Sequence, residues 1–192
     1  NILREINKHY KDNTIVATDV GQHQMWTGQF WQFNKSNEFI TSGGLGTMGF
    51  GMGAAIGAQV GNPDKKTVLV TGDGSFRMNC EELVTISKYK LPVKIVMFNN
   101  NALGMVRQWQ RMFSNARYSE TDNYDDVDYQ LLNASYCIKA YKACSMDELI
   151  KILNETDDLN EPIFLECKID RDCSVYPIVP PGRPIDELLI TG

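Results

Sequence analysis

The sequence has no excess of positive charge. Its 19 lysine and arginine residues are outnumbered by 24 aspartates and glutamates, and the formal net charge is −5. Domains that bind nucleic acids present a basic surface to the phosphates. The charge balance therefore argues against that class, and we expect no nucleic-acid partner.

Paired cysteines are also absent. The five cysteines are widely spaced, and no two of them form a C-x-x-C pair. This pattern argues against zinc and thiol–disulfide motifs. Free thiols in a reducing compartment are the simplest explanation. We therefore expect a cytoplasmic protein, or one of the plastid or mitochondrion if the source is eukaryotic.

The sequence shows no secretory leader and no long apolar run. The glycine-rich segment 49–61 is too short and too interrupted to span a bilayer, so no membrane partner is expected. The chain opens with N-I-L-R-E-I rather than with Met, which predicts a piece of a longer polypeptide. Its 192 residues, 43% of them apolar, suit one domain. We assign residues 1–170 to that domain and residues 171–192, rich in proline, to an extended tail of it.

Strand and helix patterns alternate along the chain. Helical patterns cover residues 2–11 and 49–61, a segment that opens near Ser75, and the ranges Leu103–Met112, 126 onward and Met146–Asn154. This alternation predicts an α/β fold, doubly wound, with a mostly parallel six-stranded sheet and helices on both faces. The predicted strands are Thr14–Thr18, Glu38–Thr41, Thr67–Thr71, Val93–Phe98, Ile138–Lys142 and Pro162–Ile169.

Polar residues follow two neighbouring strands. The run G-D-G-S (72–75) follows one strand, and Asn99-Asn100 follows the next. Ligands of open parallel sheets bind at the carboxyl ends of the strands. Bare glycines allow a ligand to approach, a helix start suits phosphate, and carboxylate and amide oxygens suit Mg²⁺. The combination predicts a Mg²⁺-bridged diphosphate, although either run alone is equally compatible with a simple turn.

A further strand ends in the segment 19–26, which contains Gln22 and His23. Both side chains are candidates for the same ligand edge. A turn-capping role for His23 remains open.

The run Gly44–Gly49 fits G-x-G-x-x-G and leaves a dinucleotide-binding module as an alternative. Three features argue against it. The run follows the second strand, Asp73 is flanked by glycines that a ribose-binding acid does not need, and Asn99-Asn100 has no role in that fold. Glycines at 49, 53, 57 and 61 also recur every four residues, which predicts a bare helix ridge for close packing, including packing across a subunit interface.

Together these residues resemble a known family. G-D-G followed after 24 residues by N-N resembles the thiamin diphosphate motif. The resemblance to the acetolactate (acetohydroxyacid) synthase catalytic subunit covers nearly the whole chain and concerns that subunit's C-terminal cofactor-binding domain. The matching runs are G-Q-H-Q-M-W (21–26), G-T-M-G-F-G (46–51), G-D-G-S-F-x-M-N (72–79), G-M-V-R-Q-W-Q (104–110), R-Y-S-x-T-D (117–122) and V-Y-P-I-V-P-P-G (175–182).

The resemblance implies a metal site and a cofactor site. It places Mg²⁺ on the side chains of Asp73 and Asn100 and on the backbone carbonyl of Ala102, and diphosphate donors at Gly74 and Ser75. The full set of cofactor-binding residues that it implies is Gln22, His23, Gly46, Met48, Gly72, Asp73, Gly74, Ser75, Asn100, Ala102, Leu103, Gly104 and Met105.

The resemblance also implies a substrate pocket. Met48 would hold the cofactor bent, and Met105, Val106 and Trp109 would line the pocket, with Trp109 linked to preference for 2-ketobutyrate. The spacing alone favours another interpretation of Met105 and Trp109, a core stripe of the helix.

The activity implied is condensation of pyruvate with pyruvate or 2-ketobutyrate, with loss of CO₂, in branched-chain amino acid biosynthesis. The family's proton-relay glutamate and FAD-binding domain lie outside the matched region, so we expect this chain alone to be inactive. A homodimer or higher homo-oligomer and a regulatory small subunit are the implied partners. Another thiamin diphosphate-dependent decarboxylase or lyase is the second alternative. The family's usual proline is absent at Met52-Gly53, and residues 127–135 match poorly.

Overall fold

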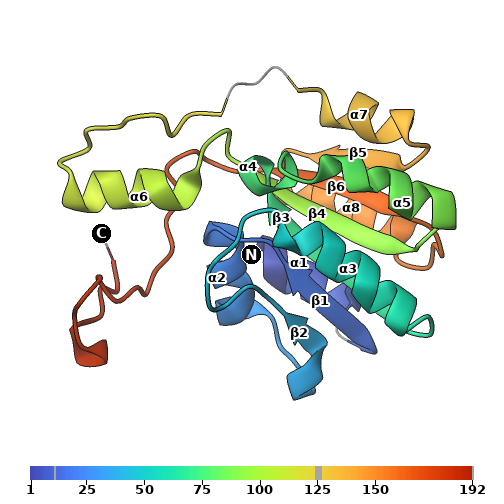
Figure 1. Ribbon diagram of the computed structural model, residues 1–192, viewed down its shortest axis with the longest axis horizontal. Helices are drawn as coiled ribbons and strands as arrows, with labels where there is room; N and C mark the ends of the chain where they lie inside the picture. Colours follow the sequence, from blue (N-terminus) through green and yellow to red (C-terminus); the bar gives the residue numbers. More distant parts are fainter. Residues whose placement is uncertain (11, 124–126, 192) are drawn as a thin grey trace.

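A single sheet of six parallel strands forms the centre of the molecule (Figure 1). The computed structural model describes residues 1–10, 12–123 and 127–191. Across the sheet the strands run in the order β2-β1-β3-β4-β6-β5, so the predicted α/β doubly wound fold is confirmed. Their bounds are β1 Thr14–Thr18, β2 Phe39–Ile40, β3 Lys66–Gly72, β4 Val93–Asn99, β5 Lys139–Ala143 and β6 Ile163–Lys168.

Helices cover both faces of the sheet because the central strands are apolar on both sides. Val68 and Val70 of β3 point into one core, and Leu69 between them points into the other. The first core is closed by α1 (Ile2–Tyr10), α2 (Gln22–Phe30) and α8 (Met146–Thr156). The second is closed by α3 (Phe50–Gly61), α4 (Asp73–Phe76), α5 (Leu83–Tyr89) and α7 (Tyr129–Ser135).

The helix α2 is not anticipated by the sequence pattern. Its fully buried residues, Gln22, His23 and Thr27, are all polar, while Trp26 and Phe30 pack against the first core and stay only partly buried. A search for apolar periodicity cannot detect such a helix. The consequence for the site is large, because α2 begins where β1 ends and carries two of the predicted site residues.

The helix expected to open near Ser75 is broken into short pieces. α4 has only four residues and starts at Asp73, a 3₁₀ turn follows at Cys80–Glu82, and α5 starts at Leu83. A macrodipole needs several aligned turns. A helix start does lie at the G-D-G-S run, as expected, but α4 is too short to add much of a dipole to its free N–H groups.

The other elements lie within a few residues of their expected positions. The expected strand Glu38–Thr41 shortens to two residues, because Ser36–Glu38 forms a 3₁₀ turn. The start expected at Asp126 lies outside the described residues, and α7 is capped instead by Asp128, whose side chain accepts from the Leu131 N–H. Of the glycine ridge, Gly49 is buried in the left-handed N-cap of α3.

The helix α6 (Gly104–Phe113) and the last residues of the chain lie to one side of the layered body (Figure 1). The tail is mostly extended, as expected, with one 3₁₀ turn at Ile185–Glu187 and a bridge between Ile178 and Leu189. Among the residues that the structure describes, none of the helices combines the length and apolar character needed to cross a membrane.

Candidate cofactor site

A pocket lies at the carboxyl ends of β1, β3 and β4. The chain leaves β1 toward β2 on one side, and β3 lies on the other, so this is the topological switch point where open α/β sheets bind ligands. Every predicted site residue except Gly46 and Trp109 lines the pocket. Its lining is Val20, Gly21, Gln22, His23, Trp26, Met48, Gly72, Asp73, Gly74, Ser75, Phe98, Asn100, Ala102, Leu103, Gly104, Met105, Val106 and Ile169.

Asp73 is the carboxylate of this pocket. It is 2% exposed, and its Oδ2 accepts a hydrogen bond of 2.8 Å from Nδ2 of Asn123. Burial raises the pKa of Asp73 above its ordinary value, and the Asn123 amide and the charge of Arg77 oppose that shift. A buried carboxylate is costly unless it is well compensated. A cation bound beside Asp73 would add to this compensation.

Asn99 and Asn100 point to different places. Asn99 donates to the buried Glu166 at 2.6 Å, so it belongs to the sheet rather than to the pocket. Asn100 lines the pocket, and its Oδ1 accepts from the Ala102 N–H at 3.1 Å. Side-chain oxygens of Asp73 and Asn100, with the Ala102 carbonyl, could together offer the oxygen-only donor set that Mg²⁺ prefers.

That donor set contains only one ionisable side chain. Consistently, the described residues contain no cluster of three or more His, Cys, Asp or Glu side chains placed to hold a metal. A small cation here would depend on phosphate oxygens to complete its shell. The site therefore fits a metal–diphosphate pair better than a metal alone.

His23 lies deep in the pocket against two glycines. A Cβ on Gly72 would stand 2.8 Å from its Nδ1, and a Cβ on Gly21 would stand 2.9 Å from its Cε1. Burial lowers the pKa of His23 to about 3, so the ring is neutral. Its Nε2 is buried without a hydrogen-bond partner. An unpaired buried ring nitrogen is costly, and a polar ligand group in the pocket would satisfy it. A hydrogen bond to the backbone of Asp19 opposes that lowering of the pKa, so the alternative in which His23 caps the turn after β1 remains a prediction beside the ligand role.

The two diphosphate donors that the resemblance implies, Gly74 and Ser75, differ in the hydrogen-bonding groups that they have available. The Ser75 hydroxyl donates its proton to the Val20 carbonyl at 2.8 Å. It can therefore accept from a ligand but not donate to it. Gly74 is held close to its neighbours, since a Cβ there would lie 2.7 Å from the Leu103 side chain. Backbone N–H groups are the donors that remain for a diphosphate.

Met48 reaches the pocket from the loop before α3, and Asp19 holds that loop. The buried Asp19 accepts hydrogen bonds from the Gly49 N–H at 2.7 Å and from the Val20 N–H at 3.0 Å. Asn79 donates to the Gly49 carbonyl at 2.7 Å. Both peptide groups of the residue after Met48 are thus fixed. Asp19, Asn79 and Asn123 were not among the predicted site residues, because no local motif marks a carboxylate or amide that acts across 30 or more positions of sequence.

The predicted substrate-pocket residues Met105, Val106 and Trp109 lie on α6, and Met105 is partly buried while the other two are exposed. Val106 is 48% and Trp109 44% exposed, so the core-stripe interpretation of Trp109 is wrong. Met105 and Val106 border the cofactor pocket, and with Trp109 and Phe113 they form an apolar surface on the outer side of α6. Gly46 lies on an exposed loop and does not line the pocket, although a Cβ on it would lie 3.7 Å from Val20, which does.

The fold and this site define a class. Residues 19–167 match the family model of the thiamine pyrophosphate enzymes, C-terminal TPP binding domain. The match covers most of the chain, which therefore belongs to this family. The cofactor predicted from G-D-G and N-N is confirmed at the level of the domain.

The more specific likeness is to acetolactate synthases. The chain is 43% identical over 188 residues to the acetolactate synthase isozyme 2 large subunit of Escherichia coli K12, which aligns over 98% of this chain. It is 46% identical over 188 residues to a probable acetolactate synthase large subunit of Methanocaldococcus jannaschii, again over 98% of this chain. It is 39% identical over 190 residues to the large subunit of Lactococcus lactis, over 97% of this chain. In each case the chain spans about a third of the relative's length, 34%, 32% and 32% respectively. The predicted resemblance is thereby confirmed.

Proposed function

We propose that this chain is the thiamin diphosphate-binding domain of an acetolactate synthase large subunit. In this role it serves the condensation of pyruvate with a second pyruvate or with 2-ketobutyrate, with loss of CO₂, in branched-chain amino acid biosynthesis. The observation that carries the proposal is the pocket at the switch point, where Asp73, Asn100 and the Ala102 backbone lie beside the unpaired Nε2 of His23. The alternative, a dinucleotide-binding module, would not require the oxygen atoms of Asp73, Asn100 and Ala102 to lie together.

Each residue then has a defined task. Asp73, Asn100 and the Ala102 carbonyl would bind Mg²⁺, which anchors the diphosphate and neutralises its charge. The backbone around Gly74 would donate to the diphosphate, and neutral His23 would present its free ring nitrogen to a polar atom of the ligand. Thiamin diphosphate, when bound, supplies the electron sink for decarboxylation of a 2-keto acid. The protein's part is to position and orient it.

Met48 and the exposed face of α6 have tasks nearer the substrate. Clamped through Gly49, Met48 is a rigid apolar support for the bent cofactor that the family resemblance implies. Met105 and Val106 border the pocket, and Trp109 lies one turn further along α6. An apolar wall of this kind suits the extra methylene of 2-ketobutyrate, which is worth about 1–3 kcal/mol in a fitted pocket.

The complete reaction requires more than these residues. Asp73 is the only carboxylate among the residues lining the described pocket, and it is assigned to the metal, so a proton-relay glutamate must come from elsewhere. We therefore expect this chain by itself to bind the cofactor weakly and to be inactive. A homodimer or higher homo-oligomer, a regulatory small subunit, FAD bound mainly outside this chain, and a cytoplasmic or organellar location complete the proposal.

Calorimetric titration tests the cofactor assignment. The chain should bind thiamin diphosphate only when Mg²⁺ is present, and it should not bind NAD. Asp73→Ala should abolish binding. Asp147→Ala, which removes a carboxylate from the far helix α8, is the matched control and should bind as the unsubstituted chain does. Binding of NAD, or unchanged binding by Asp73→Ala, would refute the assignment.

A further inference from the structure

The side chain that anchors α6 to the rest of the protein is a buried amide and not an apolar group. Gln108 is its one buried residue, at 2% exposure, while Val106, Trp109 and Phe113 on the same helix are largely exposed. Burying an amide costs free energy unless each polar atom is paired. The contacts of Gln108 therefore decide how α6 is placed.

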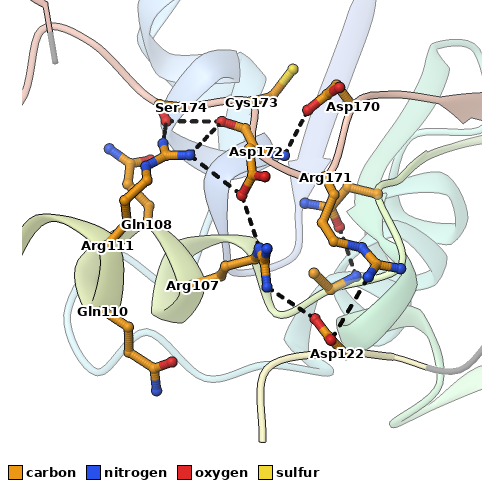
Figure 2. A network of polar contacts seen from close by, with 12 residues as sticks. Arg107, Gln108, Gln110, Arg111, Asp122, Asp170, Arg171, Asp172, Cys173 and Ser174 are labelled. Atoms are coloured by element: carbon orange, nitrogen blue, oxygen red, sulfur yellow. Dashed lines mark hydrogen bonds and ion pairs between the residues drawn. The ribbon is translucent and has the colours of Figure 1, made fainter. Parts of the chain in front are cut away.

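Gln108 pairs with the backbone of Val175 in both directions. Its Nε2 donates to the Val175 carbonyl at 3.0 Å, and its Oε1 accepts from the Val175 N–H at 2.9 Å. Backbone groups have fixed polarity, so this pair determines which end of the Gln108 amide is oxygen. The same segment is fastened to α6 by ion pairs, with Arg107 Nε 2.9 Å from Asp172 and Arg111 Nη1 3.4 Å from it (Figure 2).

The fixed oxygen of Gln108 continues into a chain of buried amides. Gln22 Nε2 donates to Gln108 Oε1 at 2.9 Å, and it also donates to the Cys173 carbonyl at 2.7 Å. Gln22 Oε1 then faces Asn100 Nδ2 at 3.4 Å. Three amides thus donate in one direction, from Asn100 to Gln22 to Gln108 to the Val175 carbonyl. Aligned buried hydrogen bonds polarise and strengthen one another.

The end of this chain is a candidate metal ligand. Because the nitrogen of Asn100 is committed to Gln22, its oxygen is the atom that accepts from the Ala102 N–H, in the pocket that Asp73 also lines. An inverted Asn100 would present an NH₂ group to the cation. We propose that Gln108 is a positioning residue that, through Gln22, holds the Asn100 oxygen in place for Mg²⁺. This inference rests on the proposed function. It also means that one side chain fixes both the metal ligand and the helix that carries Met105 and Trp109.

The chain offers a matched control on the same helix. Gln110 also pairs in both directions with one backbone residue, donating to the Ser119 carbonyl at 3.1 Å and accepting from its N–H at 2.9 Å. In Figure 2 it lies apart from the Gln108 cluster. Losing Gln110 removes the same number of hydrogen bonds between α6 and the backbone without touching Gln22 or Asn100.

The experiment measures the Mg²⁺ dissociation constant by calorimetry at saturating thiamin diphosphate, in the complete polypeptide as the cell makes it. Gln108→Met preserves volume and removes polarity. It should weaken Mg²⁺ binding by about 10- to 100-fold, the usual effect of losing a partner that orients a metal ligand. Gln110→Met should change the constant less than about twofold. Equal binding by the Gln108→Met protein, or equal losses in the two variants, overturns the proposal.

A double substitution separates positioning from general damage to the fold. If Gln108 acts through Gln22, Gln108→Met should add no further loss of Mg²⁺ affinity to a Gln22→Met protein. A double variant whose loss of Mg²⁺ affinity is the product of the two single losses overturns the proposal.

Should Gln108→Met fail to fold, Gln108→Glu replaces it. This variant keeps the oxygen that Gln22 donates to, so its Mg²⁺ affinity should stay within about threefold, and a tenfold loss overturns the proposal. If the unsubstituted protein takes up no Mg²⁺ with thiamin diphosphate, the proposed function fails together with this inference. If it does and Gln108→Met binds equally well, only the inference fails.

Discussion

The His23 ring occupies the space where a side chain on Gly72 would begin, with Nδ1 of the ring 2.8 Å from the position of that Cβ. The backbone of Gly72 is ordinary extended strand, with φ −118°, so any residue fits its conformation. Glycine is therefore required at position 72 because the His23 ring fills the space of a side chain, and not because the backbone conformation demands it. The last residue of β3 thereby limits how deeply the His23 side chain of α2 can enter the pocket.

Gly72→Ala should push His23 out of place. We expect a loss of about 1–3 kcal/mol in the free energy of unfolding, because the core cannot absorb an added methyl group, together with weaker binding of thiamin diphosphate. Denaturant unfolding and calorimetry measure the two effects. Gly28→Ala is the control, since nothing lies within 4 Å of a Cβ on this exposed helical glycine.

The cause can be isolated by removing the ring. In a His23→Ala protein the space is empty, so adding Gly72→Ala should cost almost nothing further in stability. An undiminished cost in that background would show that the contact with His23 is not the reason for the glycine.

Trp109→Ala should separate stability from substrate choice. The side chain is 44% exposed and has a ring contact with Phe113 at 6.1 Å. We expect a loss below about 1.5 kcal/mol in unfolding free energy, much less than for a buried tryptophan. In the complete polypeptide, the ratio of kcat/KM for 2-ketobutyrate over pyruvate should fall about tenfold or more.

Tyr89→Ala removes an aromatic side chain of comparable exposure, 62%, from α5. It should leave that ratio unchanged. A Trp109→Ala enzyme with unaltered preference would remove Trp109 from the substrate pocket.

Adding a methyl group to the glycine ridge of α3 should stabilise the free chain but weaken its self-association. Gly53, Gly57 and Gly61 are exposed, with no atom within 4 Å of an added Cβ. In the free chain, Gly57→Ala should raise the unfolding free energy by about 0.5–1 kcal/mol, because alanine favours the helix. In the assembly, the same methyl group should weaken self-association, measured by sedimentation, if a second backbone packs on this ridge. Gly28→Ala should stabilise α2 without affecting association, and unchanged association of Gly57→Ala would locate the subunit interface elsewhere.

Cys167 predicts how stability depends on alkaline pH. It is buried in the core of the α1–α2–α8 face, and burial, followed by the nearby Glu166, raises its pKa from 9.0 to about 12. The folded state therefore holds this proton more tightly than the unfolded state. Its contribution to stability is present below pH 9 and is lost as pH rises toward 12, by up to about 1.4 kcal/mol per pH unit.

Replacing this thiol should flatten that loss. Between pH 8.5 and 10.5, the unfolding free energy of Cys167→Ala should fall by about 2 kcal/mol less than that of the unsubstituted chain. The difference at pH 7 reports only the lost packing and is subtracted. Parallel curves over the whole range would contradict the assignment.

The sequence by itself determined the class of fold and the main ligand residues. The apolar runs of β3 and β4 are buried on both faces and could only be central strands, and the polar residues that follow them had to meet at one edge. Asp73 and Asn100 were predictable for this reason. The ligand chemistry of each residue can be recognised from its own side chain. The parallel pairing of β3 with β4 then brings the two residues to the same edge of the sheet.

The tertiary structure decided what no local pattern contains. The fully buried residues of α2 are polar, Asn99 turns to Glu166 while Asn100 turns to the pocket, and the apolar side of α6 is exposed while Gln108 is buried. Each of these depends on hydrogen-bond partners dozens of residues away. Apolar periodicity reports how much surface an element buries. The pairing of buried polar atoms is set by the three-dimensional arrangement alone, and in this protein those pairs place the site.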